Sequence, residues 1–339
     1  MAYVYRHFIP QNTAPKGAKN IGVYDGSGKK ICTIPLGTLA PPTGTKLYSF
    51  GLLSDIHLYP LAAVAWTPET KFDNALSFFE SEGCSFCTHC GDMTQTGLYN
   101  EGDKTNLAPA QLAKYKEICD KHSIPVYGIC GNHESYINPI TNNLAELKAY
   151  TGTDLYYKVE YQNDVFIFIG QPTGSTPMSD EAFTFLSSTL ASNSNKRCFV
   201  FIHPVWNDDS GDVNGLYASN GSGGGALLSS WSKGNELKAL LAQYPKAILF
   251  HGHTHFRFEE QEKDEALNYT NKNGFHSVHI PSLSRLRTVN NGALSDTDSE
   301  SQGYIVDVYE YCVVLNGIDL VNSKRVPLGT FKINVAEGT

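Results

Sequence analysis

Three histidines alternate in the segment ILFHGHTHF, where they occupy positions 251, 253 and 255. Residues two apart on a β-strand share one face, so a regular strand would place the three imidazoles side by side. Such a face is either a packed histidine cluster or a set of metal ligands, because neutral imidazole is a common metal ligand. The segment alone supports both interpretations, and the rest of the chain decides between them.

Other side chains that could bind a metal recur at one kind of place. Each follows an apolar run with the composition of a buried strand and lies where that run gives way to a loop. They are Asp55 and His57 in SDIH, Asp92 in GDMTQTG, Asn132, His133 and Glu134 in GNHE, His203 in IHP, and His253 and His255 in GHTH. Ligands of open α/β sheets bind beyond the carboxyl ends of the strands. We therefore expect these five loops to form one site.

The predicted site combines carboxylate, amide and imidazole groups and contains no thiolate. Imidazole suits zinc, iron and manganese, and carboxylate suits harder cations. The set is too large for one tetrahedral ion and sufficient for two ions that share a carboxylate. Two metal ions about 3.5–4 Å apart are an arrangement that splits phosphate esters. The expected cofactors are two metal ions, for which Mn, Fe and Zn all fit.

The ordered blocks DIH, GDMTQTG, GNHE, H and GHTH resemble those of the calcineurin-like metallophosphoesterase superfamily, over about residues 46–320. The resemblance implies an α/β fold, specifically a four-layer α/β/β/α sandwich in which two sheets pack face to face with helices outside. It also implies two sets of metal ligands, which are Asp55, His57 and His255 for the first ion, Asn132, His203 and His253 for the second, and Asp92 as the bridge.

The resemblance further implies a reaction. Two cations lower the pKa of a shared water, so that hydroxide attacks phosphorus in line, and they neutralise the phosphate oxygens. His133 would lie next to the metals without binding them and would stabilise or protonate the leaving oxygen. Asp92 and His133 are thus the expected catalytic residues. We expect the substrate, a phosphate-ester small molecule or nucleotide, to contact Asn132, His133 and Arg257.

The block GDMTQTG distinguishes between branches of the superfamily. Protein serine/threonine phosphatases have G-D-x-x-D-R-G, whereas Gln95 and Thr96 stand here. Purple acid phosphatases have a tyrosine ligand where Gln95 stands. The cyclic-nucleotide phosphodiesterase-like branch is similar at this block but has Asp at the position of Glu134. The sequence therefore favours a phosphodiesterase, with a phosphomonoesterase or a catalytically silent metal-binding scaffold or attachment protein as alternatives.

Strands and helices alternate in the segments that must position these residues, which predicts an α/β domain. Predicted strands run into the five loops from residues 46, 84, 124, 197 and 246. Helical patterns with start signals cover residues 67–83, 108–122 and 179–192. The segment LYYKVEYQNDVFIFIG predicts a hairpin that turns near Asn163 and Asp164. The C-terminal third has a β-rich, antiparallel pattern.

Two further segments stand apart from this pattern. Residues 1–45 contain a predicted β-hairpin and a linker, and residues 46–339 would form the metallophosphoesterase domain. The hairpin is similar to segments of bacterial and phage-related metallophosphoesterases, which implies an attachment module. The glycine-rich loop 204–234 is long for a compact domain, and such loops are commonly functional. We expect it to close over the substrate, with Trp206 or Tyr217 stacking on a base.

Composition restricts the class of protein. The chain has 339 residues and a formal net charge of −8 at pH 7 without a basic stripe, so tight non-specific binding of nucleic acid is not expected. The first residues lack the pattern of a signal peptide, and no apolar run approaches the ~20 residues that cross a bilayer. We therefore expect a soluble, cytoplasmic protein that does not interact with membranes.

Cys84, Cys87 and Cys90 form a C-x2-C-x2-C motif, which is compatible with an iron–sulfur or zinc site. We favour a buried strand, because SFCTHC leads directly into Gly91 and free cysteine is a common core residue. Gly252 is likewise expected to end the strand of the opening segment. His253 and His255 would then reach different metals, and His251 would be a packed neighbour.

Overall fold

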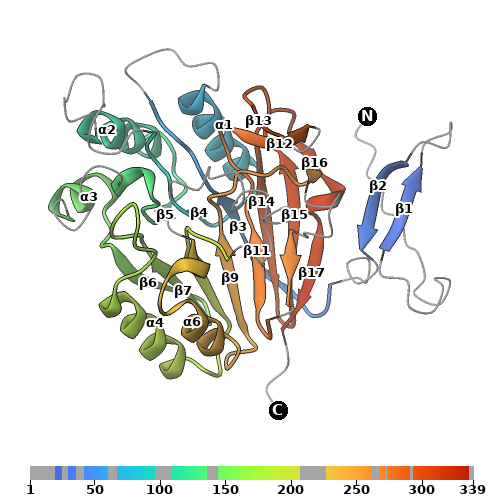
Figure 1. Cartoon of the computed structure of the whole chain (residues 1–339). Coiled ribbons are helices and arrows are strands. Elements are labelled where there is room, and N and C mark those ends of the chain that lie inside the picture. The colour runs from blue at the N-terminus through green and yellow to red at the C-terminus, as the bar shows by residue number, and fades with distance from the viewer. Residues whose placement is uncertain are drawn as a thin grey trace.

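The computed structural model describes residues 20–24, 30–35, 42–59, 67–95, 108–135, 144–206, 227–260, 268–271, 273–290 and 293–335. Two large β-sheets pack face to face, and helices cover their outer faces (Figure 1). This arrangement is the four-layer α/β/β/α sandwich that the sequence predicts.

The first sheet has seven strands in the order β16-β15-β14-β3-β4-β5, with β17 paired to β15. Strands β3 (Lys46–Leu53), β4 (Cys87–His89) and β5 (Val126–Gly128) run parallel. The predicted antiparallel C-terminal segment completes the sheet with β14 (Gln302–Tyr309), β15 (Cys312–Asp319), β16 (Lys324–Arg325) and β17 (Phe331–Asn334). Strand β14 pairs with β3, so the chain's C-terminal part lies beside the first strand of the domain.

The second sheet has six strands in the order β10-β11-β9-β8-β7-β6. Strands β7 (Asp164–Ile169), β8 (Cys198–Ile202), β9 (Ala247–His251) and β11 (His276–His279) are parallel neighbours. The edge strands are β10 (Tyr269–Thr270) and β6 (Tyr156–Tyr161), and β6 forms the predicted hairpin with β7. Strand β9 ends at His251, as expected from Gly252.

Helices cover each sheet because their apolar residues repeat at helical spacing. In α1 (Pro68–Ser81), Phe72, Ala75, Leu76 and Phe79 are buried, which places one stripe against the first sheet together with α2 (Ala108–Cys119) and α3 (Leu144–Thr151). The second sheet is covered by α4 (Asp180–Ser192) and α6 (Gly234–Leu241). Ser179 caps α4 by accepting a hydrogen bond from the Ala182 N–H at 3.1 Å.

Aromatic side chains fill the space between the two sheets. Alternate residues of each strand face this layer, among them Phe50, Phe166, Phe168, Phe199, Phe201 and Phe250. The rings of Phe168 and Phe201 stack with centroids 4.6 Å apart. The intervening residues of β7, β8 and β9 pack instead under α4 and α6. Both faces of these strands are therefore covered, which is the reason that central strands appear in the sequence as continuous apolar runs.

Smaller elements complete the described part of the chain. The N-terminal strands β1 (Asn20–Tyr24) and β2 (Lys30–Pro35) form the predicted antiparallel hairpin, and β12 (Leu286–Asn290) pairs with β13 (Ala293–Thr297). Short 3-10 helices occur at η3 (His133–Ser135), η6 (Leu228–Ser230) and η7 (Pro327–Gly329). Among the described residues, no helix is long and apolar enough to span a bilayer.

The cysteine motif runs through strand β4. Cys87 and Cys90 are buried free thiols at strand β4, and within the described residues no group of three cysteines converges on a metal position.

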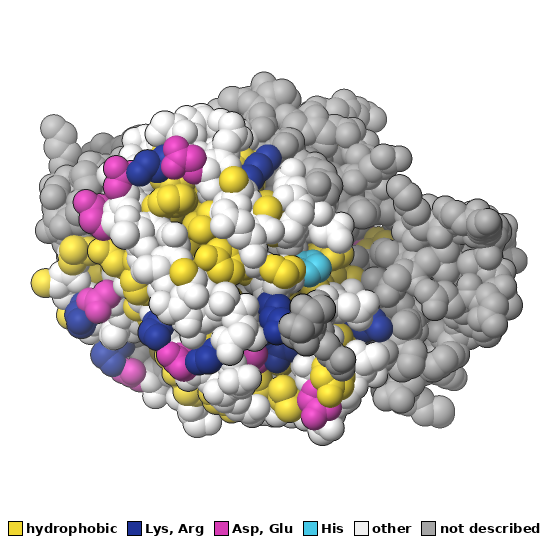
Figure 2. All heavy atoms as spheres, turned by 90° about the horizontal axis from the view of Figure 1, so that it is seen from below, with side chains coloured by type: hydrophobic (Ala, Val, Ile, Leu, Met, Phe, Trp, Pro, Cys, Tyr) yellow, Lys and Arg dark blue, Asp and Glu magenta, His cyan; other side chains and the backbone are white. Residues whose placement is uncertain are grey.

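Basic and acidic side chains lie beside one another on the face shown in Figure 2, and a broad basic patch is not visible among the coloured residues there.

Candidate metal centre

The predicted ligand loops of both sheets meet at the carboxyl ends of the parallel strands. Strands β3 and β4 lead into the loops of Asp55 and Asp92, and these loops are joined by a hydrogen bond from the His57 N–H to the Asp92 carbonyl at 2.8 Å. Strands β8 and β9 lead into those of His203 and His253. The Gly252 N–H donates to the His203 carbonyl at 3.2 Å. The chain thus brings together residues that lie far apart in the sequence.

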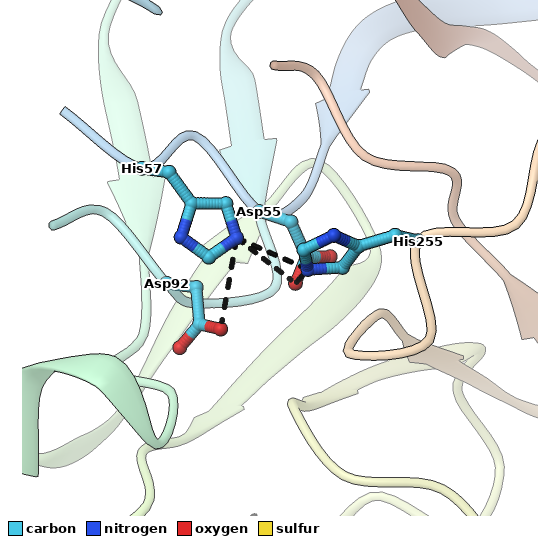
Figure 3. A group of neighbouring side chains, drawn as sticks. All are labelled: Asp55, His57, Asp92 and His255. Carbon is cyan, nitrogen blue, oxygen red and sulfur yellow. Dashed lines mark hydrogen bonds and ion pairs between the residues drawn. The ribbon is translucent and has the colours of Figure 1, made fainter. Parts of the chain in front are cut away.

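Asp55, His57, Asp92 and His255 form the first group of side chains that could hold a metal ion. All four are buried, and Figure 3 shows them pointing toward one another from the loops that follow β3, β4 and β9. The Nε2 atoms of His57 and His255 lie 3.0 Å apart, and His255 Nε2 is 3.1 Å from Asp55 Oδ1. His57 Nε2 is 4.0 Å from Asp92 Oδ2. Two ring nitrogens and two carboxylates therefore converge on one position.

Asp92 also belongs to a second group, with His203 and His253. His203 Nε2 lies 3.2 Å from Asp92 Oδ2 and 3.1 Å from His253 Nδ1. Asn132 joins this group through its Oδ1 atom, 2.9 Å from His203 Nε2. Asp92 thus belongs to both groups.

The donor atoms of these groups fit two cations. The Nδ1–H of His203 donates to the Cys90 carbonyl at 2.6 Å, which directs Nε2 toward Asp92 and Asn132. Burial lowers the pKa of His203, but the Asp92 and Asp55 carboxylates and the Cys90 carbonyl together outweigh burial and raise that pKa to about 9. The site thus favours a positive charge at the position where oxygens and ring nitrogens converge.

The pKa shifts of Asp55, His57 and His253 favour the forms of these side chains that bind metals. Burial alone would raise the pKa of the Asp55 carboxyl, but His255 and His203 outweigh it and hold the pKa below its ordinary value. Burial and His203 lower the pKa of His253 to about 3. Burial likewise holds the pKa of His57 well below the ordinary value. Anionic carboxylates and neutral imidazoles are the forms that bind metals.

Backbone strain is concentrated at these ligands. Eight non-glycine residues have a positive φ in the described part of the chain, and five of them are predicted ligands. Their φ angles lie between 52° and 73°, at Asp55, His57, Asp92, His253 and His255. Side chains with a Cβ seldom adopt this left-handed conformation, and strained backbone tends to cluster at functional sites. The strained backbone of these loops therefore orients the side chains toward the centre at a cost in conformational free energy.

Two glycines allow the loops to approach each other. A Cβ on Gly252 would lie 1.9 Å from Ser54 Oγ and 2.5 Å from Asp55 Oδ2. A Cβ on Gly131 would lie 2.2 Å from Asp92 Oδ1. Any larger residue at either position would displace a carboxylate of the centre, which explains why glycine precedes the ligands in GHTH and GNHE.

His133 lies beside the two groups and is the most exposed imidazole among them, with 20% of its side chain accessible. Its Nδ1–H donates to the Gln95 carbonyl, and its Nε2 lies 3.9 Å from Asp92 Oδ2. The ring meets that of His57 edge-on at 4.6 Å between centroids. The Nδ1–H of the His133 ring therefore has the main-chain carbonyl of Gln95 as its acceptor, and this contact does not require the amide side chain of Gln95.

Arg257 forms ion pairs with two carboxylates. Its Nε donates to Glu259 at 3.0 Å and its Nη1 to Glu300 at 3.3 Å. These carboxylates compete with any phosphate for the guanidinium, so the contacts give no support to the predicted substrate contact of Arg257. A different arginine approaches the ligand loop, since Arg287 Nη1 donates to the Thr254 carbonyl at 3.1 Å.

The predicted stacking role of Trp206 is wrong. Its side chain is 1% exposed, packs against Phe275 and lies beneath the Lys238 ammonium, 5.3 Å from the ring centroid. Trp206 follows strand β8 closely enough to remain in the packed layer under α6, so it belongs to the core. Tyr217 lies outside the described residues.

Two supporting features were not predicted. The hydroxyls of Ser282 and Ser284 donate to the Asp55 carbonyl at 3.0 and 3.2 Å, which braces the strained loop. The Glu134 carboxylate is buried and accepts hydrogen bonds from Thr94 and Gly131. Burial, followed by the nearby Asp92, raises the pKa of Glu134 to about 7. In the sequence, the alternate serines of PSLSR and the glutamate of GNHE were the features that could have indicated these contacts.

Comparisons with known proteins agree with this geometry. A family model described as calcineurin-like phosphoesterase matches residues 48–257. No curated protein matches the chain. A dimetal phosphatase from Danio rerio is similar in structure, with a TM-score of 0.60 and 14% identity over 86% of this chain and 100% of that chain.

A purple acid phosphatase from yellow lupin (Lupinus luteus) seeds is also similar, with a TM-score of 0.55 and 14% identity. The match covers 93% of this chain and 59% of the lupin chain, so this chain spans about three fifths of that relative. At such identities the two structures are evidence for the fold alone.

Proposed function

Since this chain belongs to the calcineurin-like phosphoesterase family, we propose that it hydrolyses phosphodiesters at a two-metal centre. The observation that carries the proposal is the position of Asp92, which is shared by two buried groups of ligands while His133 lies beside it. Two ions held by these groups would activate a water and neutralise the phosphate oxygens. Asp55, His57 and His255 would hold one ion, Asn132, His203 and His253 the other, and Asp92 both.

The role of His133 follows from its proton. A carbonyl only accepts hydrogen bonds, so the contact with Gln95 places a proton on Nδ1. Nε2 then gives a proton to a leaving oxygen only when the ring is an imidazolium. A bound phosphate anion favours that charged form, because a nearby opposite charge raises the pKa of a histidine. We propose that His133 protonates the leaving group and that Asn132, beside it, contacts a phosphate oxygen.

The preference for diesters has its support in the charges around the centre. A phosphomonoester dianion carries one more negative charge than a diester and needs more cationic partners. Arg257 is paired with Glu259 and Glu300, and both Arg285 and Arg287 contact Asp296. These arginines are thus largely neutralised by carboxylates, which suits a singly charged ester. GDMTQTG also lacks the acid and arginine of protein phosphatases.

A phosphomonoesterase is the second candidate, because both similar structures are named as phosphatases. To separate the two, we suggest loading the protein with Mn²⁺, Fe²⁺ or Zn²⁺ and measuring kcat/KM for bis(4-nitrophenyl) phosphate and 4-nitrophenyl phosphate. A diester-to-monoester ratio above about ten supports the proposal, given that a tenfold ratio corresponds to ~1.4 kcal/mol of transition-state discrimination. A ratio below one supports the monoesterase. Two bound ions without turnover of either ester would identify a silent scaffold.

We also propose that residues 1–45 are an attachment module separate from the catalytic domain of residues 46–339. The support is that β1 and β2 pair only with each other in the described sheets. Removing residues 1–41 should leave the metal content and kcat/KM unchanged. A large loss of either would show that the N-terminal segment completes the catalytic domain.

A further inference from the structure

Glu134 connects two of the ligand loops although it is not a member of either metal-binding group. Its Oε1 accepts hydrogen bonds from the Thr94 N–H at 2.7 Å and from the Thr94 hydroxyl at 2.9 Å. Its Oε2 accepts from the Gly131 N–H at 2.7 Å. Thr94 lies two residues after Asp92, and Gly131 directly precedes Asn132. One carboxylate thus bridges the loop of the shared ligand and the loop of the second ion.

The contact is buried and has no competitor from solvent. Glu134 is 3% exposed, and Thr94 is 1% exposed. A buried carboxylate requires hydrogen-bond donors, and three donors converge here on its two oxygens. The same two loops are joined a second time, because the His133 N–H donates to Asp92 Oδ1 at 2.9 Å. The loops therefore keep a fixed distance from each other.

Glu134 also affects the orientation of His133. The residue after Thr94 is Gln95, whose carbonyl accepts the hydrogen bond from His133 Nδ1. His133 in turn is adjacent to Glu134 in the η3 turn. The contacts Glu134–Thr94 and Gln95–His133 close a ring that includes the backbone of both loops. Moving the Thr94 segment would move the carbonyl that orients the imidazole.

We propose that Glu134 is a positioning residue, which fixes the spacing of Asp92 and Asn132 and the orientation of His133. The inference rests on the proposed function of His133 and of the metal ligands. The length of the side chain is part of the argument. An aspartate is one methylene shorter and would not reach both Thr94 and Gly131 from the same backbone position.

Glu134→Gln is the most informative variant, because glutamine has the same shape. Its single oxygen can still accept from Thr94, but its amide would face the Gly131 N–H, donor against donor. Outer partners of metal ligands typically contribute 10–100-fold in metal affinity or activity. We expect Mn²⁺ affinity, measured by competition with a chelator, to fall about 10–100-fold. The kcat should fall by a similar factor with KM little changed.

A purely structural role would lower the thermal midpoint without changing the relation between the two ions. We therefore suggest electron paramagnetic resonance of the Mn²⁺-loaded protein, in which exchange coupling depends on the spacing and bridging of the metals. Glu134→Gln should change this coupling, and Glu82→Gln, at an exposed glutamate, should not. Unchanged Mn²⁺ affinity, coupling and kcat in Glu134→Gln would overturn the proposal.

The metal measurements separate this proposal from that of the function. If the wild-type protein cleaves neither ester, the phosphodiesterase proposal fails, and Mn²⁺ affinity and coupling still test Glu134. If Glu134→Gln does not fold, Thr94→Val carries the test, since it removes only the hydroxyl donor. A threefold to tenfold weaker affinity for Mn²⁺, smaller than the roughly 10–100-fold range for such partners, supports the proposal. Wild-type affinity in that variant contradicts it.

Discussion

The backbone N–H of His253 donates to the Asp55 carboxylate, 3.1 Å from Oδ2 and 3.3 Å from Oδ1, across a separation of 198 residues. Asp55 belongs to the first metal-binding group and His253 to the second. The carboxylate that faces one ion position therefore also fixes the backbone that presents a ligand to the other. A disturbance at this contact should weaken both positions.

Gly252→Ala tests this coupling directly. The new Cβ would lie 2.5 Å from Asp55 Oδ2, so the carboxylate must move away from His253. We expect fewer than two metal ions per chain by elemental analysis, and loss of turnover. Gly152→Ala is the matched control, because its Cβ enters open space although its φ is 72°. That variant should lose about 1–2 kcal/mol of stability and keep its metals. Two bound ions in Gly252→Ala would contradict the expectation.

Asp92→Asn should affect both ions at once. The neutral amide removes the charge that two groups of ligands share, and one oxygen that faces them. We expect metal content to fall at both positions and kcat/KM to fall on the order of 10³, as when a group that stabilises transition-state charge is lost. Asp154→Asn, at an exposed aspartate that pairs with Lys148, should change neither quantity. Retention of both metals in Asp92→Asn would argue against a shared ligand.

His133→Gln should separate chemistry from metal binding. We expect two ions per chain and a kcat lower by about 10²–10⁴, the usual contribution of a general acid. In the wild-type protein, kcat should fall as the pH rises through the pKa of the His133 imidazolium in the substrate complex, and the variant should lose this limb. His122→Gln disrupts contacts to Asp73 and Glu80 on the outer face, so it should lower stability and spare kcat.

The architecture and the position of the candidate site were predictable from the sequence because the signals are local. Apolar runs end at a glycine or an aspartate, as in the segment leading to Gly91 and Asp92. The polar residues that follow such a run must lie at the edge of the sheet where the strand ends. The separation of His253 and His255 from His251 followed from one glycine. Each of these inferences needed only neighbouring residues and the geometry of a strand.

The features that the sequence did not reveal depend on contacts between distant segments. Trp206 packs against Phe275 and lies beneath Lys238, which are both distant in the sequence and which its own segment does not reveal. One carboxylate that engages Arg257 lies 43 residues away, at Glu300. The acceptor for His133 is a main-chain carbonyl, which every residue possesses and no sequence letter reveals. Such pairings become visible only when the fold places the segments together.

Trp206→Ala should act on stability and leave substrate binding unchanged. Removing a fully buried aromatic side chain leaves a cavity and costs about 3–5 kcal/mol of unfolding free energy, measurable by urea denaturation. KM for the diester should stay near the wild-type value. Trp231→Ala, at a half-buried tryptophan of the same layer, should cost less. A raised KM with unchanged stability would restore the stacking role that the structure excludes.

Glu80 should make stability depend on acid pH. Its carboxylate accepts hydrogen bonds from the Ser123 hydroxyl and from His122, which with two backbone donors lower its pKa from 4.5 to about 2. A pKa depressed by folding adds stability above pH 4.5, and this contribution is lost as the pH falls toward 2.

The difference in unfolding free energy between the wild type and Glu80→Gln should therefore shrink as the pH is lowered from about 6 to 3, in urea denaturation at each pH. Glu82→Gln, at an exposed glutamate, is the control for the removal of a surface carboxylate. A constant difference for Glu80→Gln across this range would show that the carboxylate charge plays no part.

The hydrogen bonds that orient His203 and His133 end on the main-chain carbonyls of Cys90 and Gln95. Changing the side chain at either position removes no atom of the acceptor. Substitutions at those two positions should therefore leave the tautomers of both imidazoles unchanged, provided that the backbone conformation is retained. The side chain at position 95 can therefore change while the imidazole of His133 keeps its orientation.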